Sequence, residues 1–71
     1  MRYGHALAIV MARKKVAPVE LARRLGRTRS YVSQLLNGQI REPKLSASLE
    51  IAKALDTPLQ VFVDLMYDKE D

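Results

Sequence analysis

The sequence predicts an all-α fold of five short helices that form a single domain. Apolar residues recur at helical spacing in five stretches of the 71 residues, and glycine, proline or a capping residue stands between one stretch and the next. No stretch alternates apolar and polar residues for long enough to indicate a strand. A chain of this length is typical of one domain, so we expect residues 1–71 to form one unit.

The first two helices are expected at about residues 3–15 and 18–25. Four apolar residues share one face of the first helix: Tyr3, Leu7, Val10 and Met11. The three cations of residues 13–15 suit the C-terminal end of that helix. Pro18 suits the first position of the second helix, and Gly26 suits the turn after it.

The third helix is expected at about residues 29–36. Thr28 can accept hydrogen bonds from the first backbone amides as an N-cap, and Val32, Leu35 and Leu36 supply an apolar stripe. The helix should end at Asn37-Gly38, because both residue types tolerate the left-handed conformation.

Residues 39–44 contain Pro43 and no sustained period, which predicts a loop. A fourth helix follows, with apolar residues at helical spacing: Leu45, Leu49, Ala52 and Leu55. Thr57-Pro58-Leu59-Gln60 matches a capping box, with Thr57 as the N-cap. The fifth helix is therefore expected at about residues 58–67.

Two short helices joined by Gly26-Arg27-Thr28 predict a helix-turn-helix, whose second helix enters the major groove of DNA. Arginine, glutamine and serine are side chains that bond base edges. The expected base contacts are Arg29, Ser30, Ser33 and Gln34. The expected phosphate contacts lie near the two ends of the helix: Arg27, Tyr31, Asn37, Gln39, Arg41 and Lys44. Tyr31 as a packed surface aromatic and Ser33 as a small spacer are the structural alternatives.

The sequence resembles the Cro/C1-type, or XRE, helix-turn-helix family of phage and bacterial repressors over about residues 5–65. The resemblance is carried by Leu21-Ala22, Gly26, Val32-Ser33, Asn37-Gly38, Pro43 and Ile51-Ala52-Lys53-Ala54-Leu55. It implies a compact five-helix bundle of the lambda-repressor-like DNA-binding type, a role in transcriptional repression or activation, and a homodimer on a two-fold symmetric operator. Restriction-modification controllers and DNA-binding antitoxins use the same domain.

The resemblance also assigns roles to individual residues. It places base contacts at Arg29, Ser30 and Gln34, and a phosphate contact at Asn37. The family's phosphate-clamping glutamine at the start of the second helix is Pro18 here, which has no donor. An arginine–glutamate pair found in many members is replaced by Met11 and Leu36, and a well-packed apolar pair is physically an adequate substitute.

Charge and composition favour a polyanionic partner and disfavour catalysis. The formal net charge is +4, but residues 1–55 carry eleven Lys/Arg and three Asp/Glu, whereas residues 56–71 carry one lysine and five acids. Without cysteine and with His5 as the single histidine, we expect no disulfide, no metal site, no cofactor and no enzyme. A reducing cytoplasm agrees with this composition. The apolar residues 6–12 are followed by the cations of residues 13–15 and by no cleavage-site pattern, so we expect neither a signal peptide nor a membrane span.

The fifth helix is apolar over more of its circumference than one core contact needs. Leu59, Phe62, Val63 and Met66 share one face, and Val61 and Leu65 extend the apolar surface sideways. We expect this helix to contact a second subunit, with Val61, Leu65 and Met66 in the dimer interface. A wide core face on a monomer is the alternative.

The sequence thus predicts a cytoplasmic, sequence-specific regulator of transcription, in the first place a repressor, that binds double-stranded DNA as a homodimer. A DNA-binding antitoxin, a restriction-modification controller and a helical protein-interaction module remain as alternatives. RNA is disfavoured because the deep, narrow groove of its A-form helix does not admit a recognition helix.

Overall fold

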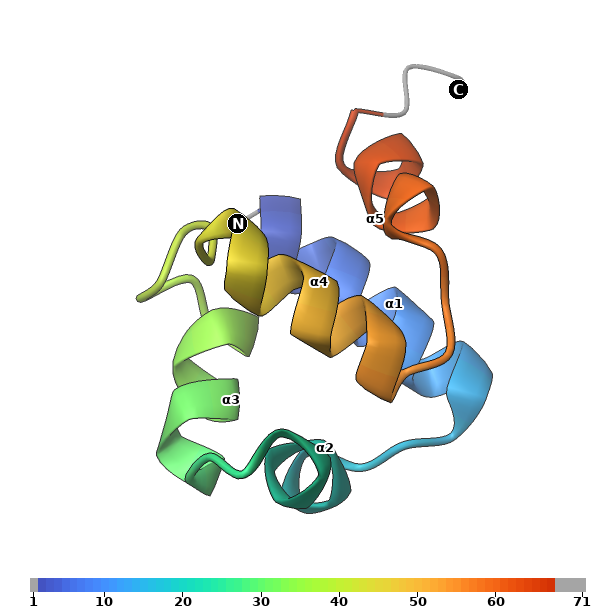
Figure 1. Ribbon diagram of the computed structural model, residues 1–71. Helices are drawn as coiled ribbons and strands as arrows, with labels where there is room; N and C mark the ends of the chain where they lie inside the picture. Colours follow the sequence, from blue (N-terminus) through green and yellow to red (C-terminus); the bar gives the residue numbers. More distant parts are fainter. Residues whose placement is uncertain (1, 68–71) are drawn as a thin grey trace.

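A computed structural model describes residues 2–67, which form five α-helices and no strand (Figure 1). The helices are α1 (Arg2–Lys14), α2 (Pro18–Leu25), α3 (Arg29–Leu36), α4 (Leu45–Ala54) and α5 (Leu59–Met66). The predicted all-α fold is confirmed, and the bounds of α2 and α3 agree with those expected from the sequence.

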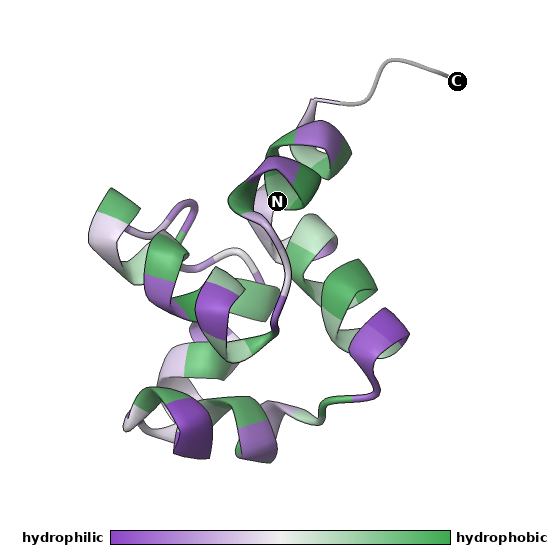
Figure 2. Ribbon diagram, turned by 45° about the vertical axis from the view of Figure 1, so that its right-hand side comes forward, coloured by the Kyte–Doolittle hydropathy of each residue, from purple (hydrophilic) through white to green (hydrophobic). Residues whose placement is uncertain are grey.

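The helices pack around one apolar core. α1 packs against α3 and α5, α2 packs against α3 and α4, and α4 contacts α5, so that α2 lies at one end of the molecule and α5 at the other (Figure 1). Each helix has hydrophilic as well as hydrophobic positions (Figure 2). The largest fully buried side chains are Phe62, Leu7, Leu21, Leu35, Ile51, Leu55, Val10 and Val32. None of the described helices has the length and hydropathy that crossing a membrane requires.

Gly4 lets α1 approach the end of α3 closely. A Cβ atom at this position would lie 2.5 Å from the carbonyl oxygen of Leu35 and 2.8 Å from that of Leu36. Because both neighbours are backbone atoms, no side-chain rotation relieves the overlap. The absence of a side chain at Gly4 therefore sets the distance between α1 and α3.

Three helices end with a residue in the left-handed conformation. These residues are Lys15 after α1, Gly26 after α2 and Asp56 after α4, with φ of 57°, 68° and 50°. In each case the next amide donates to the carbonyl five residues earlier over 2.9 Å, which is the main bond of a Schellman motif. α1 consequently ends at Lys14, one residue earlier than predicted.

The capping box predicted before α5 is wrong. Thr57 follows the left-handed Asp56 and is buried, and its hydroxyl donates to the carbonyl of Leu55 over 2.8 Å. Pro58 takes the N-cap position without a side-chain cap, and the amide of Gln60 donates to Asp64 instead of reaching back. Thr57 thus closes the end of α4, and α5 begins at Leu59.

Candidate nucleic-acid interface

The turn between α2 and α3 has the tight geometry expected of a helix-turn-helix. Gly26 adopts the left-handed conformation that ends α2, and Thr28 is extended, with φ −79° and ψ 159°. The Thr28 hydroxyl accepts a hydrogen bond from the amide of Tyr31 over 3.2 Å. The predicted N-cap is confirmed, and it fixes Arg29 as the first residue of the recognition helix.

The outer face of α3 carries the side chains predicted to contact bases. Val32 and Leu35 are fully buried and hold the opposite face of α3 in the core. Arg29, Ser30 and Ser33 are exposed, and Gln34 is half-buried. Within residues 2–67 none of these four polar side chains makes a hydrogen bond or an ion pair. Their donors and acceptors are available to a ligand.

The predicted phosphate contacts fall into separate groups. The Arg27 guanidinium lies over the Tyr31 ring, with its central carbon 4.6 Å from the ring centre. A shallow hollow on the α3 side of this pair is lined by Gly26, Arg27, Thr28, Ser30, Tyr31 and Gln34. A second hollow, toward α4, also contains Lys44 together with the carboxylates of Glu42 and Glu50. Arg27 and Tyr31 therefore form the ridge between the two hollows.

Asn37 and Gln39 form a pair of their own beyond the end of α3. The Gln39 amide donates to the Asn37 side-chain oxygen over 2.9 Å, and the Asn37 side-chain nitrogen donates to the Gln39 side chain over 3.2 Å. Asn37 has φ −93°, so Gly38 alone takes the left-handed conformation predicted for this dipeptide. Arg41 is exposed in the following loop and lines neither hollow.

The arginines of α2 are engaged inside the domain. Glu20 accepts hydrogen bonds from Arg23, at 2.6 Å, and from Arg24, at 3.0 Å. The hydrogen bond from Arg23, followed by that from Arg24, lowers the pKa of the Glu20 carboxyl. Arg24 also donates to the carbonyl of Ala54 at the end of α4 over 2.8 Å. The bond from Arg24 to Ala54 was not predicted from the sequence. The ion pairs of Glu20 were not predicted either, although Glu20 has the spacing to Arg23 and Arg24 that is typical of helical ion pairs.

The match to a family model decides what kind of domain this is. The helix-turn-helix model matches residues 11–62, which include α2, α3 and α4. The chain belongs to the Cro/C1-type helix-turn-helix family. It therefore contains a DNA-binding domain, and its five-helix architecture is consistent with the lambda-repressor-like fold. A comparison with curated proteins gives no match.

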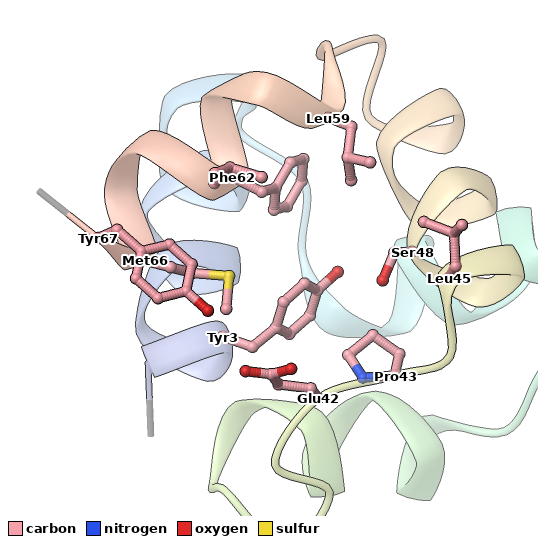
Figure 3. Close-up of a pocket in the computed structure, with 10 residues that line it drawn as sticks. Tyr3, Glu42, Pro43, Leu45, Ser48, Leu59, Phe62, Met66 and Tyr67 are labelled. Atoms are coloured by element: carbon pink, nitrogen blue, oxygen red, sulfur yellow. The ribbon is translucent and has the colours of Figure 1, made fainter.

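A groove lies away from the turn between α2 and α3. It is formed by α4, α5 and the start of α1 (Figure 3). The rings of Tyr3 and Phe62 stack at its floor with their centres 5.9 Å apart. The Tyr3 hydroxyl is buried and is the one buried side-chain polar atom of the described residues without a hydrogen-bond partner. Burial is also the main reason why the pKa of Tyr3 is raised.

The apolar side chains of α4 and α5 differ in how far they are exposed. Val61, Leu65 and Met66 are half-buried and pack against the core. More exposed apolar side chains are Leu45 (67% exposed), Leu49 (50%), Tyr67 (48%) and Val63 (37%). Of the stripe predicted for the fourth helix, only Ala52 and Leu55 are buried. The exposed Val63 and Tyr67, at the end of α5, line the groove together with Leu45 at the start of α4.

Proposed function

We propose that this chain is a sequence-specific transcriptional regulator, acting in the first place as a repressor, that binds a two-fold symmetric DNA operator as a homodimer in the cytoplasm. The observation that carries the proposal is the capped α3, whose outer face presents unengaged arginine, serine and glutamine side chains. These are the groups that discriminate base edges in the major groove. No catalytic role is part of the proposal.

Arg29 supports this proposal more strongly than the other polar residues of α3. It occupies the first position of the helix, where a cation is disfavoured by the helix dipole, and the first turn contains no acidic residue. Its side chain is exposed and unpaired within the described residues. A guanine at the bound site supplies the two acceptors that an arginine at this position lacks.

Arg29→Ala is expected to cost about 1–3 kcal/mol of binding free energy at one base pair per half-site. The measurement is equilibrium binding to the selected operator and to duplexes with that base pair replaced. The variant should bind all of them about equally, whereas the wild-type domain should distinguish them. Arg13→Ala, which removes an exposed charge from the end of α1, is the matched control and should keep the discrimination. An Arg29→Ala variant with the wild-type base preference would remove Arg29 from the base contacts.

The homodimer is proposed on the apolar surface of α4 and α5. Val61, Leu65 and Met66 remain its expected members, and the exposure of Val63 and Leu49 adds these two. Small domains gain stability when such a surface is covered by a second subunit. A homodimer of this kind would have to place its two recognition helices one turn of DNA apart, roughly 34 Å.

Val63→Glu is expected to convert the dimer to a monomer with little effect on folding, because Val63 is exposed and a charge there costs desolvation only in the dimer. Sedimentation equilibrium across a concentration series measures the change, and thermal unfolding of the monomer verifies the fold. Val19→Glu on α2 is the control, since Val19 is exposed but lies away from α5. A wild-type chain that stays monomeric at high concentration would contradict the proposal.

A DNA-binding antitoxin, a restriction-modification controller or a protein-interaction module is the alternative, and the apolar groove at Tyr3 and Phe62 is the observation that favours the interaction role. If this groove binds a helix of another protein, the chain should be monomeric in the absence of that protein. The same sedimentation experiment therefore separates the protein-interaction module from the homodimer.

A further inference from the structure

We infer that Arg27 and Tyr31 together form a binding site for one backbone phosphate of the DNA, in which the ring of Tyr31 positions the Arg27 guanidinium. The inference rests on the proposed function. It places in the turn a phosphate contact that the start of α2 does not supply.

The start of α2 offers no cationic side chain for a phosphate. Pro18 has neither a side-chain donor nor an amide hydrogen, and Val19 is apolar. The next residue, Glu20, is an acid that holds Arg23 and Arg24. In the turn between α2 and α3, Arg27 is a cation whose donors make no hydrogen bond or ion pair with the described residues.

Stacking on Tyr31 restricts the guanidinium without using its hydrogen-bond donors. A cation–π contact engages the flat face of the group, whereas its N–H donors lie in the plane. Arg27 makes no other hydrogen bond or ion pair within residues 2–67. Tyr31 is itself half-buried against the core and is held by its place in the first turn of α3. The contact thus restricts the guanidinium while its donors stay free, which lowers the entropy lost on binding.

The charges around the ridge indicate the side on which the phosphate lies. The hollow toward α4 is lined by Glu42 and Glu50 as well as by Arg27 and Lys44, so its charges balance and it attracts an anion only weakly. The hollow over α3 contains no carboxylate among its lining residues, and it adds the hydroxyls of Thr28 and Ser30. A phosphate seated there is next to the base-contacting face of α3, as a register-setting contact must be.

The test is a cycle of variants measured against a selected operator and a scrambled duplex over a range of salt concentrations. Arg27→Ala should weaken binding to both duplexes by about tenfold per half-site, with the preference between them unchanged. The slope of log affinity against log salt should fall by about 0.9 per half-site. Replacing single phosphates by uncharged methylphosphonates should locate one position that matters for the wild-type domain and not for Arg27→Ala.

Tyr31 is tested through its dependence on Arg27. Tyr31→Phe keeps the ring and should bind as the wild type does, whereas Tyr31→Leu should weaken binding by about two- to fivefold. In the Arg27→Ala background, Tyr31→Leu should have no further effect. Thermal unfolding verifies that Tyr31→Leu folds, and Tyr31→Phe and Arg27→Ala keep the test decisive if it does not.

Three results would overturn the inference: an altered base preference in Arg27→Ala, an undiminished effect of Tyr31→Leu without Arg27, or a loss in Tyr31→Phe as large as that in Tyr31→Leu. A wild-type domain that does not distinguish the selected from the scrambled duplex would instead refute the proposed function.

Discussion

Phe62→Ala is expected to lower the free energy of unfolding by about 3–5 kcal/mol, the usual cost of removing a buried aromatic ring. Phe62 is almost completely buried, stacks on Tyr3 and anchors the short α5 in the core. A domain of 71 residues has a total stability of about 4–10 kcal/mol, so the change removes a large part of it. Chemical denaturation at fixed protein concentration measures the loss.

Val63→Ala is the matched control for Phe62→Ala, because Val63 is the next residue of α5 and is exposed. In a variant kept monomeric by dilution it should cost less than about 0.5 kcal/mol. Equal losses for Phe62→Ala and Val63→Ala would contradict the placement of α5 against α1.

Gly4→Ala is expected to destabilise the domain by about 1–3 kcal/mol, although alanine is the better helix former. The added Cβ would lie 2.5 Å from the carbonyl oxygen of Leu35, so α1 and α3 must move apart. That movement opens the core and displaces the end of the recognition helix. Thermal and chemical unfolding measure the stability, and operator binding should weaken in parallel.

His5→Ala is the control for Gly4→Ala, because His5 is the next residue of α1 and is exposed. It should leave stability within about 0.5 kcal/mol of the wild type. A Gly4→Ala variant more stable than the wild type would show that helix propensity outweighs the close approach of the two backbones.

The helices around the turn were predictable because their signals are local. Pro18, Gly26 and Thr28 each fix a helix end through their own backbone or side chain, and the bounds of α2 and α3 follow from them. Lys15 and Asp56 end helices in the same left-handed conformation without being glycine. The hydrogen bonds of the Schellman motif hold Lys15 and Asp56 in this conformation. The residue types themselves give no signal of it in the sequence.

The capping box before α5 shows how a local signal can mislead. Thr57 and Gln60 have the residue types and spacing of that motif. The left-handed Asp56 turns Thr57 back toward α4, where its hydroxyl bonds the carbonyl of Leu55. The end of one helix thus determined the start of the next.

Contacts between distant residues set the features that sequence analysis missed. The need for glycine at position 4 comes from the carbonyls of α3, and the role of Arg24 comes from the carbonyl of Ala54, thirty residues away. Leu45 and Leu49 have the spacing of a buried stripe but lie at the margin of the core. Periodicity gives the face of a helix, and only packing decides how much of that face is covered.

The individual residues of the candidate interface were predicted from the sequence, but the contacts between their side chains were not. Arg29, Ser30 and Ser33 lie exposed on α3 as expected from their spacing around Val32 and Leu35. The pairing of Arg27 with Tyr31, and of Asn37 with Gln39, depends on side-chain conformations that the order of residues does not specify.

The central claim, sequence-specific recognition of DNA by α3, is tested most directly by selecting bound duplexes from a random pool and measuring affinity for the winner at physiological salt. We predict a two-fold symmetric site with half-sites about one helical turn apart, bound at least about 10³-fold more tightly than a scrambled duplex. Equal affinity for the selected and scrambled duplexes, with no common sequence among the selected ones, would contradict the claim.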